Sequence, residues 1–407
     1  MPNEPTNKDT APRVAVTGMG IISAIGNSVQ ENMEALLASK SGIGSISKIN
    51  TVHADQIRVG EVAFSNDELI SQQQLSDDNN FTRTSLLGLF AAKEALKNAK
   101  ITGINSYKTG LISSTTVGGM DKTEQHLKTF KTSSESQKYI SSHHAGDSTK
   151  KIAKQLGITE FSTTISTACS SSTNAIMLGA RLIKAGKLDR VIVGGTDALT
   201  KFTINGFKTL MILSDEVCTP FDEHRKGLNL GEGAAYLVLE SETIAKKENK
   251  SIIAYISGYA NTNDAFHQTA TSENGQGAYL AMQKALDFAH LKPAQIDYIN
   301  AHGTATPNND LTESIAIKRV FGDDIPDFSS TKAYTGHTLA ASGAVEAVFS
   351  ILALQAQTVF PNLNFKSKIN ETGLTPTTEI KKKPINYVLS NSFGFGGNCS
   401  TLILSKE

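Results

Sequence analysis

Short apolar segments alternate along the chain with longer segments in which apolar residues recur at every third or fourth position. The short segments predict β-strands, and the periodic ones predict helices. In the first 250 residues, strands are predicted at 13–17, 110–116, 163–166, 191–194 and 234–239. Helices are predicted after Asn27 and over 84–100 and 170–185. This alternation indicates an α/β fold whose sheets are covered on both faces.

A second series of the same kind begins near residue 252. It predicts strands at 252–259, 296–300, 387–391 and 401–405, and helices at 277–290, 310–321 and 340–357. The two series resemble two copies of one unit, so we expect two halves, 13–250 and 251–407. Residues 1–12 are polar, contain proline and lack the apolar core of a secretory signal, which predicts a disordered tail.

The overall composition is that of a soluble globular protein, with 39% hydrophobic and 19% charged residues. Basic and acidic residues number 39 each, so the chain has no net charge with which to attract nucleic acid or an anionic membrane. No stretch reaches the roughly 18 consecutive apolar residues of a membrane span. Cys169, Cys218 and Cys399 are too few and too scattered for a disulfide framework or a CxxC zinc site, which indicates a reducing, cytoplasmic location.

The first predicted strand is followed by Gly18-Met19-Gly20, which invites comparison with nucleotide-binding loops. The segment lacks the third glycine of GxGxxG, and no acidic residue ends a clear second strand. We therefore expect no dinucleotide site here. The two glycines instead predict a tight turn between strand and loop that needs glycine dihedral angles.

Cys169 lies in the segment STACSSSTNA, at the start of the predicted helix 170–185. Residues 175–183 are apolar nearly all round, which predicts a central, buried helix. Unpaired N–H groups and the positive end of the helix dipole stabilise a thiolate at such a position and lower a cysteine pKa from about 8.5 to roughly 3.5–7.5. Cys169 is therefore a candidate nucleophile, and a buried structural cysteine is the alternative.

Two histidines lie in loops of small and hydroxyl residues at the ends of predicted elements. His302 follows the strand 296–300 in NAHGTATP, and His337 precedes the long helix in STKAYTGHTL. Loops at element ends often carry function, and two imidazoles with a cysteine could form a nucleophile with paired donors. Lys332 and Glu346 flank His337 and could orient the site, unless they form an ordinary surface pair.

A glycine-rich loop, NSFGFGG at 391–397, follows a predicted strand. Its glycines would let the backbone approach a ligand closely, and its phenylalanines could plug or open a pocket. A simple turn is the alternative interpretation. Three glycines among the aromatic residues make that alternative the weaker one.

Taken together and in this order, several segments resemble the β-ketoacyl synthase family, the condensing enzymes of fatty acid and polyketide synthesis. The resemblance runs from about Val14 to Leu404. It implies a thiolase-like α/β fold in which two duplicated halves form a five-layer αβαβα arrangement, usually as a homodimer. The segments are GMGIISAIGNSV, STACSSS, VIVGGTDAL, PFDEHRKGLNLGEGAA, DAFHQTA, NAHGTATPNND, STKAYTGHTLAASGAVEA and NSFGFGG.

The resemblance implies a role for individual residues. Cys169 matches the acyl-accepting nucleophile, and His302 and His337 match the two active-site histidines of elongating synthases. Lys332 and Glu346 match the supporting charged pair. Phe395 matches the gating phenylalanine, whose backbone N–H joins that of Cys169 in an oxyanion hole. Thr304 and Thr306 match residues that hold the phosphopantetheine arm, and Val117 matches a position in the acyl tunnel. Phe393 and His267 are further matches to substrate-binding positions.

The activity that the resemblance implies is that of a 3-oxoacyl-[acyl-carrier-protein] synthase in fatty acid elongation. Such an enzyme condenses malonyl-carrier with an acyl group on its cysteine, and it needs the acyl carrier protein but no metal or redox cofactor. Carrier proteins are acidic, so a local basic patch is expected. Arg83 and Lys208 are candidates for it, with solvated surface charge as the alternative.

Some positions depart from the common family pattern. Asn398-Cys399 follows NSFGFGG where Thr-Asn or His-Asn is usual, Ala340 stands where glycine is frequent, and 228–230 is Leu-Asn-Leu. A specialised ketosynthase for polyketides or aryl polyenes is therefore an alternative, and a heterodimer with a related subunit is possible. A non-catalytic partner of the chain-length-factor type usually lacks the cysteine. A cysteine hydrolase would leave Lys332 and the second histidine loop unexplained.

Overall fold

The computed structural model describes residues 12–76 and 78–407, so the predicted tail, apart from its last residue, lies outside the described part. Ten strands form one large mixed sheet, in the spatial order β11-β10-β14-β15-β9-β1-β8-β6-β4-β5. In chain order these strands are β1 (Val14–Ile22), β4 (Thr109–Ser114), β5 (Phe161–Ile165), β6 (Arg190–Asp197), β8 (Gly233–Ser241), β9 (Ala254–Asn263), β10 (Tyr298–Asn300), β11 (Asp327–Ser329), β14 (Tyr387–Gly394) and β15 (Asn398–Ser405).

The two halves of this sheet have the same topology. From the outer edge inward, the order is β5, β4, β6, β8 and β1 in the first half and β11, β10, β14, β15 and β9 in the second. In each half this is the third, second, fourth, fifth and first strand along the chain. The outer three strands of each half are parallel, and the fourth, fifth and first pair antiparallel. The first strands of the two halves meet through the pairs Ala15↔Tyr255 and Val16↔Ala254. The chain is therefore duplicated in topology, although the two copies differ in sequence.

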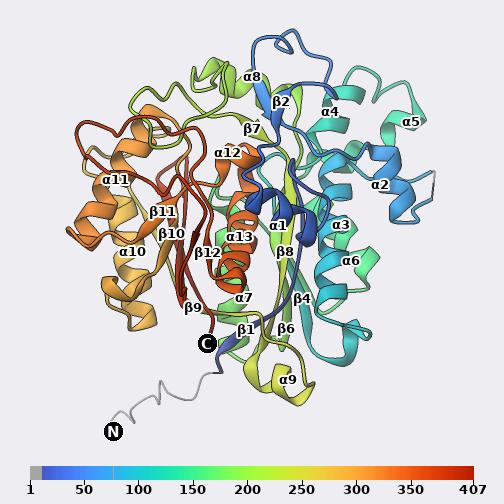
Figure 1. The fold of residues 1–407 in the computed structure, drawn as a ribbon. Coiled ribbons are helices and arrows are strands. Elements are labelled where there is room, and N and C mark those ends of the chain that lie inside the picture. Colours follow the sequence, from blue (N-terminus) through green and yellow to red (C-terminus); the bar gives the residue numbers. More distant parts are fainter. Residues whose placement is uncertain (1–11, 77) are drawn as a thin grey trace, which may run out of the picture.

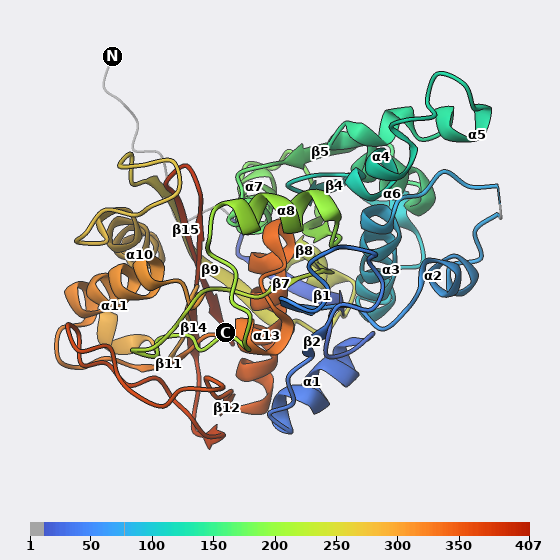
Figure 2. The same ribbon diagram turned by 90° about the horizontal axis from the view of Figure 1, so that it is seen from above.

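Helices cover both faces of each half, which produces five layers (Figures 1 and 2). Helices α3 (Arg83–Asn98) and α6 (Gly146–Leu156) cover the outer face of the first half. Helices α10 (Gln276–Ala289) and α11 (Pro307–Phe321) lie outside the second half. The helices α7 and α13 pack against each other between the halves, and they span Ser171–Lys184 and Ser342–Ala356. The predicted αβαβα arrangement of a thiolase-like fold is confirmed.

The hydrophobic pattern did not predict strand β11 or helix α6 of this frame, nor most of the smaller elements that surround it. The remaining helices are α1 (Val29–Leu37), α2 (Asn66–Gln72), α4 (Met120–His126), α5 (Ser134–Gln137), α8 (Lys201–Thr209), α9 (Glu242–Lys247) and α12 (Lys332–Thr335), with the short 3-10 turns Ile104–Ser106, Ile140–His143, Pro293–Gln295 and Leu339–Ala341. The minor strands are β2 (Ile43–Ser45), β3 (Arg58–Gly60), β7 (Leu230–Gly231), β12 (Thr358–Val359) and β13 (Lys381–Lys382).

The central helix α13 is apolar on every side. The segment Leu339–Ala356 is long and apolar enough, by composition, to cross a membrane, but 89% of it is buried inside the molecule. Its side chains pack against strands of both halves, and Glu346 is its single charged residue. A helix that is hydrophobic all round in this way belongs to the core of a large protein.

The expectation of a tight turn at Gly18 and Gly20 was wrong, because both glycines lie inside strand β1. Neither has a positive φ. A Cβ atom on Gly18 would lie 2.5 Å from the carbonyl oxygen of Ala95, and one on Gly20 would lie 2.1 Å from that of Ala91. The glycines are therefore needed so that helix α3 can lie directly on the strand, rather than for their backbone freedom.

Helix α7 approaches the sheet closely at a glycine in the same way. A Cβ atom on Gly179 would lie 2.5 Å from Cγ1 of Val193 on strand β6. In contrast, a Cβ atom on Gly206 of helix α8 would meet no other atom within 4 Å, and the backbone of Gly206 is helical. The two glycines therefore form a matched pair, one needed for packing and one not.

We expect Gly179→Ala to lower the free energy of unfolding by about 1–3 kcal/mol, because overpacking outweighs the better helix propensity of alanine. Gly206→Ala should raise it by up to about 1 kcal/mol. Chemical denaturation of the two variants measures both changes. An unchanged stability of Gly179→Ala would mean that helix α7 can shift away from the sheet at no cost.

Candidate functional site

Cys169 lies in the turn between strand β5 and helix α7, which begins at Ser171. The preceding residue, Ala168, has a left-handed backbone with φ +52°. The hydroxyl groups of Ser170 and Ser171 donate to the carbonyl oxygens of Thr167 and Ala168, at 2.7 and 2.5 Å. The serines of STACSSS therefore hold the turn, and the cysteine side chain is left 6% exposed.

The loop 391–397 is a hairpin between strands β14 and β15 that packs directly on this turn. A Cβ atom on Gly394 would lie 3.1 Å from the backbone nitrogen of Cys169 and 2.9 Å from the carbonyl oxygen of Thr167. The backbone N–H of Phe395 lies close enough to the sulfur of Cys169 to favour its anion. The Phe395 ring stacks on Phe207 of helix α8, with ring centroids 6.0 Å apart. The glycine-rich loop is thus in contact with the candidate nucleophile.

The expectation of a lowered cysteine pKa was wrong. Burial raises the pKa of the Cys169 thiol from 9.0 to about 11, although the charge of Lys332 and the N–H of Phe395 act in the opposite direction. Desolvation disfavours a thiolate more strongly here than the nearby positive charge favours it. Cys169 therefore rests as a neutral thiol, close to donors that can stabilise its anion.

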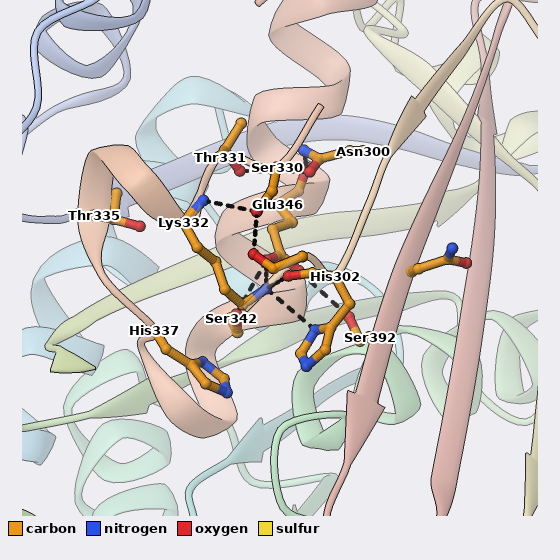
Figure 3. A network of polar contacts seen from close by, with 12 residues as sticks. Asn300, His302, Ser330, Thr331, Lys332, Thr335, His337, Ser342, Glu346 and Ser392 are labelled. Carbon is orange, nitrogen blue, oxygen red and sulfur yellow. Dashed lines mark hydrogen bonds and ion pairs between the residues drawn. The ribbon is translucent and has the colours of Figure 1, made fainter. Parts of the chain in front are cut away.

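His302 is held by the ammonium group of Lys332 (Figure 3). The Lys332 Nζ donates to the His302 ring nitrogen Nδ1 at 3.1 Å and to the His302 carbonyl oxygen at 2.6 Å. Its third hydrogen bond goes to Oε1 of Glu346. Because an ammonium group can only donate, Nδ1 of His302 must be the acceptor, and the ring proton lies on Nε2.

His337 is held in the same tautomer by the backbone. The N–H of Leu339 donates to Nδ1 of His337 at 3.3 Å, which leaves the ring proton on Nε2. The His337 backbone donates to the carbonyl oxygen of Asn229 at 2.7 Å and accepts from Gly231 at 3.0 Å. The rings of His302 and His337 lie 5.5 Å apart and nearly perpendicular.

Both imidazoles are neutral. Burial, followed by the positive charge of Lys332, places the pKa of His302 and that of His337 well below the usual value. Each ring therefore offers one N–H donor and no positive charge. Two neutral donors side by side suit a ligand oxygen that becomes negative during a reaction.

Lys332 and Glu346 form a buried ion pair, so the interpretation as a surface pair was wrong. Their side chains are 3% and 2% exposed. The hydroxyl group of Ser342 donates to the Glu346 carboxylate at 3.2 Å. Removing one member of such a pair leaves an uncompensated buried charge, which costs about 3–5 kcal/mol.

Two cavities meet at Cys169. The first has a volume of about 320 Å³ and also contains the rings of His302 and His337 in its wall. The second has a volume of about 490 Å³. Phe395 lines both cavities and so stands between them. The other predicted substrate-binding residues divide between the two, with Thr304, Thr306, Phe393 and His267 in the first and Val117 in the second.

The sequence did not reveal the carboxylates that shape the His302 loop. The Glu313 carboxylate accepts from the backbone N–H groups of His302 and Gly303, both at 2.8 Å. Burial raises the pKa of Glu313 to about 7. The Asp310 carboxylate accepts from the N–H of Ala305 at 3.1 Å. The two carboxylates lie one turn apart on the buried face of helix α11. Acidic residues on the buried face of a predicted helix were the feature of the sequence that could have revealed them.

Arg83 is excluded as a docking residue for an acidic partner. Its guanidinium is buried and donates to both carboxylate oxygens of Glu232, with Nε at 2.8 Å and Nη2 at 2.5 Å. A buried, paired guanidinium cannot bind a second protein. Lys208 is half-buried in the last turn of helix α8 and stays a candidate.

The alkylation rate of Cys169 is expected to keep rising above pH 9.0 and to reach half of its maximum only near pH 11, because burial outweighs the charge of Lys332 and the N–H of Phe395. Iodoacetamide kinetics on a Cys218→Ala, Cys399→Ala double variant would report this thiol alone, with Cys169→Ala as the blank. A midpoint near pH 6 to 7 would instead show that the helix N-terminus dominates, as in cysteines of roughly that pKa.

Comparison with known sequences places this chain in a family. Residues 11–245 match the N-terminal domain of β-ketoacyl synthases, and residues 253–366 match the C-terminal domain. The 3-oxoacyl-[acyl-carrier-protein] synthase 2 of Staphylococcus aureus (strain N315) is 35% identical, over 97% of this chain and 98% of its own length. The protein of the same name from Coxiella burnetii is 34% identical, over 97% and 98%.

Solved structures agree with this assignment. The ishigamide ketosynthase/chain length factor matches with a TM-score of 0.92 at 30% identity, over 98% of this chain and 100% of that one. A ketosynthase in complex with its chain length factor, from Xenorhabdus doucetiae, matches with a TM-score of 0.85 at 30% identity, over 100% of both chains. Both halves of the chain, its fold and its full-length relatives lead to one conclusion: the protein belongs to the β-ketoacyl synthase family.

Proposed function

We propose that the protein is a 3-oxoacyl-[acyl-carrier-protein] synthase, an acyltransferase that forms carbon–carbon bonds in fatty acid elongation. One observation carries the proposal: Cys169, His302 and His337 line one cavity. The buried Lys332 adds to it, because it fixes the tautomer of His302. A nucleophile and two neutral donors are the groups that a decarboxylative condensation requires.

The first step transfers an acyl group to Cys169. The sulfur attacks the carbonyl carbon of an acyl-carrier thioester, the bond to the carrier sulfur breaks, and the thiol proton ends on the carrier thiol. The N–H of Phe395, which favours the anion of Cys169, can support the developing charge together with the N–H of Cys169. Lys332 supplies the nearest positive charge for the transient thiolate.

The second step joins two carbon atoms. Malonyl-carrier loses its carboxylate as carbon dioxide, and the electron pair of the broken bond forms an enolate. The Nε2–H groups of His302 and His337 donate to the enolate oxygen. The enolate carbon attacks the acyl thioester on Cys169, the carbon–sulfur bond breaks, and a 3-oxoacyl-carrier leaves. The scheme uses no metal ion or redox group, because loss of the carboxylate supplies the electron pair.

The two cavities divide the substrate between them. The smaller one, with Thr304, Thr306 and His267 in its wall, suits the phosphopantetheine arm of the carrier. The larger one runs past Val117 and has mainly apolar lining residues, which suits an acyl chain. Phe395, between the two, is in a position to gate the passage.

The partners follow from the same scheme. We infer that the protein binds an acyl carrier protein and acts as a dimer, either with a second copy or with a related subunit. The two solved ketosynthases described above are associated with chain length factors, which is the precedent for the second arrangement. The three cysteines are buried free thiols, which suits a cytoplasmic location.

A specialised ketosynthase for polyketides or aryl polyenes would run the same reaction on a different acyl chain. Neither the curated relatives nor the solved structures favour this alternative over fatty acid elongation. A panel of saturated, polyene and aryl acyl-carriers, each incubated with malonyl-carrier, identifies the accepted chain. The presence of Cys169 and both histidines argues against a non-catalytic partner subunit.

We expect an acyl-carrier thioester to add one acyl group to the protein at Cys169, and Cys169→Ala to abolish both this adduct and condensation. Cys169→Gln should retain malonyl decarboxylation, because the histidines and not the thiol stabilise the enolate. His302→Ala in that background should lower decarboxylation about 10²–10³-fold. Intact-protein mass spectrometry and carbon dioxide release measure these effects.

Cys218→Ala is the matched control, because Cys218 is also buried but lies outside both cavities. It should leave the adduct intact. Loss of decarboxylation together with condensation in Cys169→Gln would contradict the division of labour between thiol and histidines. Hydrolysis of the acyl thioester without a new carbon–carbon bond would indicate a hydrolase instead.

Lys208→Glu should raise the KM for carrier-bound substrates and leave the KM for short thioester analogues unchanged. The reason is that Lys208 lies at the end of helix α8, close in sequence to Met211 at the first cavity, where an acidic carrier would dock. Lys284→Glu, an exposed change on the outer helix α10, is the control. Equal effects on both substrates, or on both variants, would refute a docking role for Lys208.

A further inference from the structure

Asp197 is a fully buried carboxylate at the end of strand β6, and the scheme above gives it no task. It accepts hydrogen bonds from two separate segments. On one side, the backbone N–H of Thr116 and its hydroxyl group donate to Oδ2 of Asp197 at 3.1 and 2.6 Å, and the hydroxyl of Thr115 donates to Oδ1. On the other side, the N–H of Ala340 donates to Oδ2 at 2.9 Å.

The two segments serve different parts of the site. Thr116 and Val117 form part of the wall of the larger cavity. Ala340 follows Leu339, whose N–H donates to Nδ1 of His337. Leu339 also lines the larger cavity. Asp197 therefore connects the wall that an acyl chain would touch with the turn that orients a catalytic imidazole, across the boundary between the two halves.

A carboxylate suits this position because Thr115, Thr116 and Ala340 all direct hydrogen-bond donors at it. Burial raises the pKa of Asp197, and the hydrogen bonds from Thr115, Thr116 and Ala340 oppose that rise. An asparagine has the same size but places an amide N–H₂ against one of these donors. The substitution therefore breaks the junction while it preserves the volume of the side chain.

We infer that Asp197 is a positioning residue that couples the wall of the acyl cavity to the orientation of His337. The inference rests on the proposed condensation for its kinetic consequences. It goes beyond that proposal because the condensation scheme above gives Asp197 no role. The inference states that a change in the cavity wall at Thr116 alters the orientation of the His337 ring. The carboxylate of Asp197 transmits this effect.

Asp197→Asn should lower the rate of malonyl decarboxylation about tenfold per folded molecule, because misplacing a catalytic group by about 1 Å is enough for such a loss. Glu240→Gln is the matched control. Glu240 is also fully buried and accepts from several donors, but it lies on strand β8 opposite Arg190, at the far end of strand β6. It should lower stability and leave the rate per folded molecule unchanged. Equal rate losses in both variants would reduce Asp197 to a structural residue.

Thr116→Val tests the coupling itself. This change removes one donor to Asp197 at the cavity wall, keeps the branched shape of the side chain and leaves both histidines unchanged. It should lower decarboxylation about three- to tenfold in the wild-type background and have no further effect in Asp197→Asn. Full additivity of the two losses, or an unchanged rate in Thr116→Val, would overturn the inference.

The ¹⁵N spectrum of His337 gives a readout that needs no substrate. Its ring nitrogens, assigned with a His337→Gln variant, should shift in Asp197→Asn and in Thr116→Val but not in Glu240→Gln. A wild-type protein that forms no acyl adduct and releases no carbon dioxide would refute the proposed function, and the spectrum would still decide the coupling. Unchanged His337 shifts in an active enzyme would refute the coupling alone.

Discussion

The buried ammonium group of Lys332 is the interaction on which the rest of the site depends. It donates to Glu346, to the His302 carbonyl oxygen and to the His302 ring. In this way one charge sets the tautomer of His302, adds to the burial that keeps both imidazoles neutral, and favours the Cys169 thiolate against the effect of burial. The charge is tolerable only because helix α13 places a carboxylate beside it. This need for a buried counter-charge accounts for the single glutamate in the otherwise uncharged central helix α13.

The duplicated topology explains why the reactive groups converge. Cys169 lies between the third strand and the central helix of the first half, and Lys332 and His337 lie between the third strand and the central helix of the second. His302 follows the second strand of its half, as Thr116 follows the second strand of the other. Equivalent loops of two copies therefore meet at the boundary between them. The first copy contains the candidate nucleophile Cys169, and the second contains the two imidazoles that are proposed as donors.

Parallel strands and buried helices position the reactive groups, but desolvation sets their protonation states. Cys169, His302 and His337 all rest in their neutral forms because each is removed from water. A site of this kind holds its charge in one ion pair and supplies N–H donors to whatever charge develops on the substrate. Fixed donors in a buried cavity need little reorganisation at the moment of reaction.

The order of most strands and main helices, but not strand β11 or helix α6, could be predicted from the sequence, because it depends on local periodicity. The same holds for the buried character of helix α7 and, through short motifs, for the candidate roles of Cys169 and the two histidines. The tertiary structure alone decided the rest. It placed Gly18 and Gly20 under helix α3, buried Arg83 against Glu232, and raised rather than lowered the pKa of Cys169. It also brought Asp197 to Ala340 and Glu313 to His302. Most of these outcomes depend on contacts between residues far apart in the chain, and on how completely each group is removed from water. A local pattern of residues carries neither kind of information.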